Sequence, residues 1–212
     1  MKRKITKITV QKNQKRVNIF LDEKFGFGLD LENHVLLGLK VGQELSDEEI
    51  SEITKKAEYQ NTYNNLLRFA TLRPRSEKEI YDWFKKHKVS ENLYIKLFDK
   101  LKHLNLANDY EFAKWWIEQR IQFKSKSKKD LEYELRIKGI AKEIINEVLS
   151  ESGIDELGAA QKLIKKNIYK WERLDKFKKK QKIYEFLARK GFGWPVINSI
   201  LKRYLNSEID DI

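Results

Sequence analysis

The sequence predicts a mainly α-helical protein, a tandem array of three three-helix repeats that follows a small N-terminal β-hairpin or meander. Three observations favour this class. Apolar residues at helical spacing recur in three copies, about 51 and then 52 residues apart. Only two prolines and nine glycines interrupt the 212 residues, which suits long helices. The first 30 residues instead contain the alternation of half-buried strands.

The N-terminal region, 1–60, is expected to combine strands with helices. Alternating apolar residues predict one strand: Val17, Ile19 and Leu21. Two other extended pieces are expected, one at Ile5, Ile8 and Val10 and one through 25–29. A short helix over 31–39, ended by Gly38, should follow, because glycine readily adopts the left-handed conformation that ends helices. Such a small sheet must pack on a helix to be stable.

A long helix is expected to complete this region. Ser46 and Glu49 have the spacing of a capping box, in which a serine and a glutamate three residues later satisfy the free N–H groups of a helix start. The helix should run from about 47 to 72. Its polar, amide-rich middle at 59–62 indicates a break.

Three repeats should occupy 61–105, 106–153 and 154–212, the last of them ending in an acidic tail at 208–212. Equivalent core positions are Ile80, Leu131 and Ile183, then Phe84, Leu135 and Leu187. The helices that lead the repeats are expected over 61–72, 109–123 and 157–171. Repeats of this length mainly contact their neighbours, so an elongated and curved array is expected.

Two of the three copies share a hinge between their second and third helices. Lys138-Gly139-Ile140 and Lys190-Gly191-Phe192 each place glycine where a helix ends. The first copy has Lys88 at this position, and a different turn is expected there. Asp109 has the position of a helix N-cap.

Charge and composition restrict the class of partner. Lys and Arg number 44 against 32 Asp and Glu, a net charge of +12, so nucleic acid or an acidic protein surface is an expected partner. A solvated lysine surface is the alternative. There is no cysteine, no apolar signal core and no apolar run near the roughly 20 residues of a membrane span. A cytoplasmic protein without membrane contact is expected.

No motif predicts an enzyme. His34, His87 and His103 lie far apart and have no metal-ligand spacing. The sequence has no Walker loop and no nucleophile elbow. Gly26-Phe27-Gly28 lacks the third glycine of a dinucleotide site. We therefore expect no catalysis, no cofactor and no bound metal.

Three stretches resemble the RecX family. Within 67–80, Arg73, Ser76, Glu79 and Ile80 match that family's R-x-x-S-x-x-E-L helix entry. Residues 109–120 resemble its D-x-x-F-A-x-x-W-I-x-x-R segment, and 134–140 match the E-L-x-x-K-G-I that follows. Residues 186–192 resemble F-L-x-R-R-G-F. The loop at 123–127 is rich in lysine and serine where the family has a glycine-rich loop.

The resemblance implies a regulator of the RecA recombinase. Family members bind RecA and its filament on single-stranded DNA, inhibit its recombinase, ATPase and coprotease activities, and so modulate recombination, DNA repair and the SOS response. Some also bind DNA directly. A monomer is expected. Insertion into the filament groove and capping of one filament end both remain open. The alternative from the residues is a stand-alone DNA-binding helical repeat protein.

Basic clusters before the middle helix of each repeat are the candidate RecA and DNA contacts. Residues 160–205 hold 14 Lys or Arg against three acidic residues. A continuous basic track is the hypothesis, with a solvated lysine surface and a structural role for Arg120 as alternatives. Its members are Arg73, Arg75, Arg120, Lys124, Lys126, Lys128, Lys129, Lys165, Lys166, Arg173, Lys176, Lys178, Lys179, Lys180 and Lys182.

Aromatic residues lie among these charges. Trp115, Trp116, Tyr169 and Trp171 have the chemistry to stack on bases. Core packing is the favoured use of these aromatic residues, above all of Trp116, because thin helical repeats need bulky side chains. Tyr169 and Trp171 are the better candidates for exposure.

Overall fold

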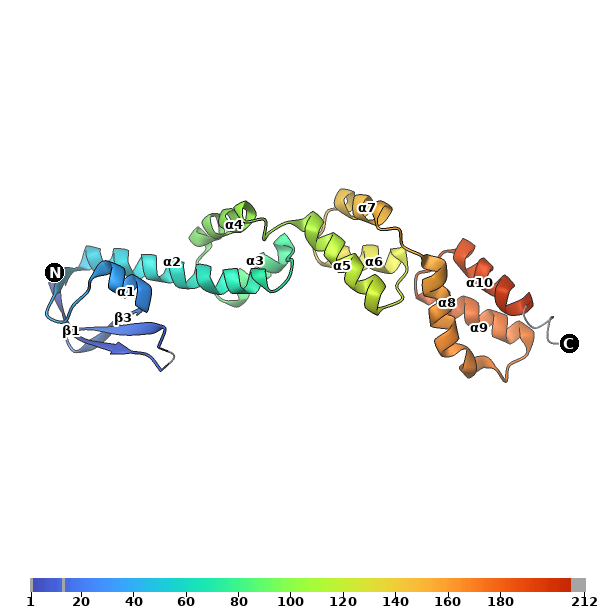
Figure 1. Ribbon diagram of the computed structural model, residues 1–212, viewed down its shortest axis with the longest axis horizontal. Helices are drawn as coiled ribbons and strands as arrows, with labels where there is room; N and C mark the ends of the chain where they lie inside the picture. The colour runs from blue at the N-terminus through green and yellow to red at the C-terminus, as the bar shows by residue number, and fades with distance from the viewer. Residues whose placement is uncertain (1, 13, 207–212) are drawn as a thin grey trace. The chain divides into compact units, whose positions relative to one another are not determined.

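The structure is a computed structural model that describes residues 2–12 and 14–206 (Figure 1). The acidic tail at 208–212 lies outside the described residues. The chain divides into two compact units, 1–72 with 85–100, and 73–84 with 101–212. Two helices, α3 (Glu77–Lys86) and α4 (Tyr94–His103), contribute residues to both. Each unit is described by itself.

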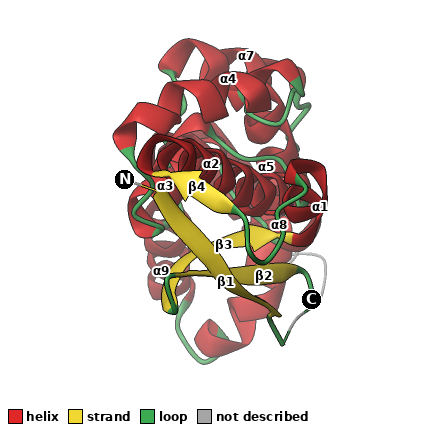
Figure 2. Ribbon diagram, turned by 90° about the vertical axis from the view of Figure 1, so that its left-hand side faces the viewer, coloured by secondary structure: helices red, strands yellow, loops and turns green. Residues whose placement is uncertain are grey.

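The first unit begins with a four-stranded antiparallel sheet (Figure 2). Its strands lie in the order β3-β2-β1-β4, with the bounds β1 Lys2–Val10, β2 Arg16–Leu21, β3 Lys24–Asp30 and β4 Glu44–Ser46. Asp22 and Glu23 join β2 to β3 with φ of 49° and 67°, the geometry of a tight type I′ hairpin turn. The N-terminal strand subdomain is confirmed. The short β4 was not expected, because three residues are too few to display alternation.

One face of this sheet packs on the helix α2 (Asp47–Thr71). Ile5, Ile19 and Leu29 are fully buried, and Ile53 and Ala57 of α2 complete the same core. The short helix α1 (Leu31–Leu37) precedes it and ends at Gly38 with φ of 58°, as expected. Ser46 and Glu49 form the expected capping box at the start of α2.

The helix α2 is continuous, so the expected break at 59–62 and the separate helix at 61–72 are wrong. The rings of Tyr59 and Tyr63, one turn apart, stack with centroids 6.4 Å apart. Lys96 of α4 places its ammonium 4.6 Å from the centroid of the Tyr59 ring, and Lys100 lies 4.7 Å from that of Tyr63. Cation–π contacts of this kind stabilise helix pairs. The polar residues at 59–62 therefore lie within a continuous helix that these contacts stabilise, and they do not interrupt it.

The second unit contains two complete three-helix repeats. The repeat α5–α7 comprises α5 (Asp109–Phe123), α6 (Lys128–Ile137) and α7 (Lys142–Glu151). The repeat α8–α10 comprises α8 (Glu156–Asn167), the 3-10 turn η2 (Ile168–Trp171), α9 (Lys176–Arg189) and α10 (Trp194–Asn206). Each has its own core, with buried residues at equivalent positions: Ala113, Ile117, Leu131 and Leu135 in one, and Ala160, Ile164, Ile183 and Leu187 in the other. The helical-repeat fold class is confirmed.

The same hinge conformation occurs in all three copies. Gly139 and Gly191 have φ of 83° and 78°, as expected. Lys88, before the 3-10 turn η1 (Glu91–Leu93) and α4, also has a positive φ of 51°. The expectation of a different turn there is therefore wrong. A lysine accepts the left-handed conformation at some cost in free energy, which glycine avoids.

Two classes of feature are absent from residues 2–12 and 14–206. Over these residues, no helix has the length and apolar character needed to cross a membrane. The same part of the chain holds no cluster of three or more His, Asp or Glu side chains arranged for a metal ion.

Candidate functional site

Two joints in the second unit use the same hydrogen bond. In the first joint, Ser76 Oγ, just before α3, donates to the carbonyl oxygen of Lys138 at 2.9 Å. In the second joint, Ser127 Oγ, just before α6, donates to the carbonyl oxygen of Lys190 at 2.7 Å. Each serine also accepts the backbone N–H three residues later, at 3.1 Å. Both serines are fully buried, so each fastens the start of one middle helix to the end of the next one.

A second contact also recurs in both joints. The backbone N–H of Glu77 donates to Asp109 Oδ1 at 2.8 Å, and that of Lys128 donates to Glu156 Oε1 at 2.9 Å. The N-cap of α5 is Asn108, so the expectation that Asp109 caps this helix is wrong. Burial raises the pKa of Asp109 above its ordinary value, against the effect of the donated hydrogen bond. The carboxylate joins two helices instead of capping one.

The charges of the first joint converge on Glu79. Arg73 donates to both carboxylate oxygens, at 2.8 and 3.1 Å, and Lys138 Nζ donates to one of them at 2.7 Å. The Arg73 guanidinium also lies 5.1 Å from the centroid of the Trp115 ring. Arg75 Nη1 is 3.8 Å from the carboxylate and is only 9% exposed. Burial alone would raise the pKa of Glu79, but the hydrogen bonds from Arg73 and Lys138 outweigh it and lower that pKa.

Arg120 is held within the repeat α5–α7. Its guanidinium lies 4.0 Å from the centroid of the Trp116 ring, and its Nε donates to Glu134 at 2.7 Å. Trp116 Nε1 donates to the same carboxylate oxygen at 2.8 Å, and Lys126 Nζ approaches Glu134 to 3.2 Å. Burial would raise the pKa of Glu134, but these donors lower it. Of the candidate contacts, Arg73, Arg75 and Arg120 thus have partners inside the fold.

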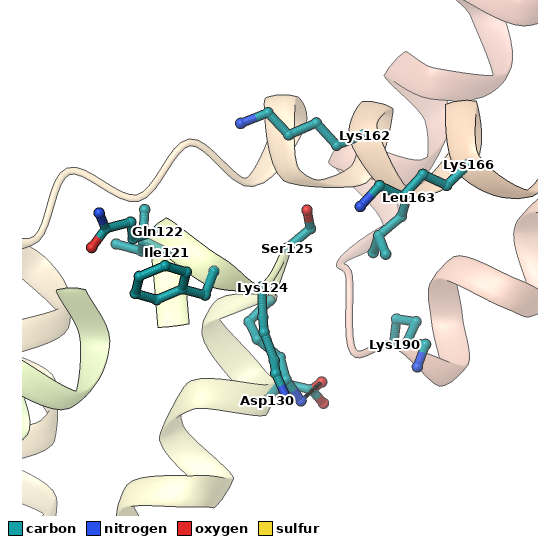
Figure 3. Close-up of a pocket in the computed structure, with 11 residues that line it drawn as sticks. Ile121, Gln122, Lys124, Ser125, Asp130, Lys162, Leu163, Lys166 and Lys190 are labelled. Atoms are coloured by element: carbon teal, nitrogen blue, oxygen red, sulfur yellow. Dashed lines mark hydrogen bonds and ion pairs between the residues drawn. The ribbon is translucent and has the colours of Figure 1, made fainter. Parts of the chain in front are cut away.

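A cavity of about 400 Å³, open to solvent on one side, lies at the second joint. Figure 3 shows Lys124 on the loop after α5, Lys162 and Lys166 on α8, and Lys190 at the end of α9. The structure therefore brings together three candidate residues, Lys124, Lys126 and Lys166. Sequence reasoning missed Lys162 and Lys190. The four-residue spacing of Lys162 and Lys166, which puts both on one helix face, was the available signal.

The remaining candidate lysines lie outside this cavity. Lys165 lines a second cavity of about 490 Å³ with Arg203 of α10. Lys178 and Lys182 form local ion pairs with Asp175 and Glu185, at 3.4 and 3.2 Å. Exposed candidates on α6, on α9 and between η2 and α9 are Lys128, Lys129, Arg173, Lys176 and Lys180, and Lys179 is half-buried. Their joining into one continuous track stays a prediction.

The aromatic candidates differ in how deeply they are buried. Trp115 and Trp116 are half-buried beneath Arg73 and Arg120. Trp171 is also half-buried, with its ring 5.5 Å from that of Phe186, so the expectation that it is exposed is wrong. Tyr169 is 62% exposed, as expected, and the Lys170 ammonium lies 5.6 Å from the centroid of its ring.

Family models match three parts of the chain. Residues 3–46 match the regulatory protein RecX N-terminal domain. Residues 108–149 match the second three-helix domain of RecX, and 154–201 match the third.

Several similar proteins bear one name. A protein of Bacillus licheniformis named "Regulatory protein RecX" is 37% identical over 93% of this chain and 76% of its own length. One of the same name from Clostridium perfringens strain SM101 is 35% identical over 97% of this chain and 98% of its own. A solved structure titled "Crystal structure of regulatory protein RecX" covers 95% of this chain and 99% of its own, with a TM-score of 0.67 and 26% identity.

Proposed function

Because this chain belongs to the RecX family, we propose that it binds the RecA recombinase and its filament on single-stranded DNA and restrains them. It lowers RecA's ATPase, strand-exchange and coprotease activities and so modulates recombination, DNA repair and the SOS response. The similar proteins are named regulatory proteins. We propose accordingly a cytoplasmic monomer that performs no reaction of its own.

The recurrence of one joint is the observation that carries this proposal. The bonds Ser76–Lys138 and Ser127–Lys190 relate successive middle helices by the same contacts. A chain that repeats one geometry presents similar surfaces at successive steps, as a polymer of identical subunits does. A surface that repeats in this way suits a filament as its partner better than a small molecule.

The charge of the repeat α8–α10 supports a filament that contains DNA. Its exposed lysines on α9 include Lys176, Lys178 and Lys180. Attraction to phosphates is non-specific and falls steeply with salt concentration. These lysines therefore supply attraction and orientation, while contacts with RecA supply specificity.

The test is RecA's DNA-dependent ATPase, measured with increasing amounts of this protein. Inhibition should persist at a salt concentration that abolishes the protein's own binding to bare DNA. Inhibition that disappears together with DNA binding would instead favour the second candidate, a stand-alone DNA-binding protein, which the excess of lysine favours. Inhibition at amounts far below one molecule per RecA indicates end capping, whereas groove filling requires amounts comparable to RecA.

A charge-reversal variant tests the role of α9. Replacing Lys176, Lys178 and Lys180 by Glu should weaken inhibition while the unfolding temperature stays unchanged. The matched control reverses the same number of exposed lysines in the first unit: Lys55, Lys56 and Lys86. Equal inhibition by both variants would remove α9 from the interface.

A further inference from the structure

The cavity of the second joint is lined by an excess of positive charge. Five lysines line it, on the α5–α6 loop, α8 and the end of α9: Lys124, Lys126, Lys162, Lys166 and Lys190. Asp130 is the carboxylate in the lining, and Lys126 is bonded to it at 3.1 Å. Across the described parts of the chain, the ammonium groups of the other four make no ion pair. Four like charges around one cavity repel one another, and a bound anion would relieve that repulsion.

The first joint has the same framework, but its charges are neutralised internally. The shared hydrogen bonds align Ser76 with Ser127 and Asp109 with Glu156. Counting from these pairs, Arg73 corresponds to Lys124, Glu79 to Asp130, Lys138 to Lys190 and Trp115 to Lys162.

Three of these four pairs differ in residue type, and the differences change the chemistry of the joint. In the first joint, Arg73 spans both oxygens of Glu79 and covers the Trp115 ring. In the second joint, a shorter carboxylate is engaged by Lys126, and a lysine stands in place of the tryptophan. The same framework therefore has its charges neutralised internally in the first joint, whereas in the second joint it leaves a positively charged cavity.

Apolar side chains form another part of the same lining. Ile121 and Leu163 contribute to it together with Phe123 at the end of α5. Phe123 is 71% exposed, so its ring is accessible to a partner. Aromatic rings beside lysines are typical of sites that hold single-stranded nucleic acid, because bases stack on rings while ammonium groups hold phosphates.

We infer that this cavity binds single-stranded nucleic acid, with a backbone phosphate among Lys124, Lys162, Lys166 and Lys190 and a base against Phe123. A strand suits the site better than a single carboxylate, because its successive backbone phosphates can engage several ammonium groups at once. The inference deepens the proposed function, since a RecA filament contains such a strand. The experiments that test it omit RecA, so that a failure of this inference can be distinguished from a failure of the proposed function.

The primary experiment measures fluorescence anisotropy of a labelled oligo-dT with the full-length protein. Replacing Lys124, Lys162 and Lys190 by Gln should weaken binding by about tenfold or more and flatten the dependence of affinity on salt. The control replaces three exposed lysines of the first unit, Lys55, Lys56 and Lys86, by Gln, and should stay within about twofold of the original. Equal losses in the two variants would overturn the site.

A second set of variants tests the cavity without a large change in charge. Phe123→Ala should weaken oligo-dT binding by about fivefold or more, and Phe123→Trp should retain it. Lys162→Trp installs the residue of the first joint and should fill the cavity, weakening binding while the unfolding temperature is kept. Full binding by both Phe123→Ala and Lys162→Trp would contradict the inference.

Competition identifies the ligand. Unlabelled oligo-dT should displace the probe, whereas thymidine monophosphate and polyglutamate at the same concentration of charged groups should not. Equal displacement by the monophosphate would assign a free nucleotide instead of a strand, and equal displacement by polyglutamate would assign an acidic peptide. RecA ATPase assays on the same variants then report separately on the proposed function.

Discussion

Ser76 and Lys138 are joined by a hydrogen bond in which a helix cap also serves as a connector. Ser76 Oγ donates to the Lys138 carbonyl at 2.9 Å while it accepts the N–H of Glu79 at 3.1 Å. A hydroxyl has one donor and free acceptor capacity, so this residue fills both roles. An aspartate caps a helix equally well but has no proton to donate to a carbonyl. The same reasoning explains serine at position 127.

The first prediction concerns these two serines. Ser76→Ala and Ser127→Ala should each lower the free energy of unfolding by about 1–3 kcal/mol, because each leaves a buried carbonyl and a helix N–H unsatisfied. Ser76→Asp should also destabilise, although it preserves the cap. Urea unfolding followed by circular dichroism measures the change. The exposed Ser150→Ala is the control and should stay within about 0.5 kcal/mol. A cost at Ser76 no greater than that control would refute the connector role.

The second prediction is a pH dependence that arises from Glu79. Burial opposes its ionisation, yet the hydrogen bonds from Arg73 and Lys138 hold the pKa of Glu79 below its ordinary value of 4.5. A group with a lowered folded pKa contributes stability above its unfolded pKa, and loses that contribution as pH falls through the folded value. The effect is therefore complete at neutral pH and disappears in acid, below about pH 4.5.

The variant Glu79→Gln tests this directly. It should lose about 2 kcal/mol at pH 7, since charge-assisted hydrogen bonds are lost and the cations Arg73 and Lys138 lose their partner. Its difference from the original should shrink as pH is lowered through the acid range. Glu143→Gln, at an exposed position of α7, is the matched control. A difference that remains constant from pH 7 to acid would exclude Glu79 as the source.

The helical periodicity was sufficient to predict the repeats and their core. Ile80, Leu131 and Ile183 are all buried to within 1% exposure, as their equivalent positions required. The continuity of α2 was not predictable in this way, because Tyr59 and Tyr63 are supported by Lys96 and Lys100, which come about 37 residues later. Tertiary contacts of this range leave no trace in local composition.

The third prediction follows from the hinge conformation at Lys88. Its φ of 51° is unfavourable for a side chain with a Cβ atom. Lys88→Gly should therefore stabilise the protein by about 0.5–1 kcal/mol, after the entropy that glycine loses on folding is subtracted. Thermal unfolding monitored by circular dichroism measures the gain. A destabilised Lys88→Gly protein would mean that the lysine side chain makes a stronger contribution than the backbone strain.

The converse substitution should be costly. At Gly191, φ is 78°, and an added Cβ would lie 2.7 Å from Ser127 Oγ, the connector of the second joint. Gly191→Ala should lower the free energy of unfolding by about 1–3 kcal/mol. Gly193→Ala is the control, because its Cβ would approach only the Pro195 ring, at 3.6 Å. Equal stability of the two variants would contradict the account of the joint.

The basic character of the candidate site could be predicted from the sequence, but the sequence did not show which of its charges are neutralised within the fold. The basic clusters were evident in the sequence. The expectation that the third cluster precedes its middle helix is wrong, because Lys176, Lys178 and Lys180 lie within α9 itself. Only the structure separates Arg73, which is bonded to Glu79, from Lys124, its equivalent without an ion pair in the described residues. The equivalent residues Trp115 and Lys162 also distinguish the two joints, because they differ in type. They lie on α5 and α8, apart from the basic residues that precede α3 and α6. Counting charges along the chain does not reveal which of them are neutralised.

The last prediction uses the difference between arginines paired within the fold and exposed lysines to separate effects on stability from effects on binding. Arg73→Gln and Arg120→Gln should each destabilise the protein by about 1–3 kcal/mol, because each leaves a partly buried carboxylate without its main donor. Charge reversal at Lys176, Lys178 and Lys180 should change stability by no more than about 0.5 kcal/mol, since these side chains are exposed. Under conditions where every variant is fully folded, the arginine variants should still restrain RecA, and the lysine variant should do so more weakly. The opposite pattern would place the filament contact at the first joint and make the α9 lysines a solvated surface.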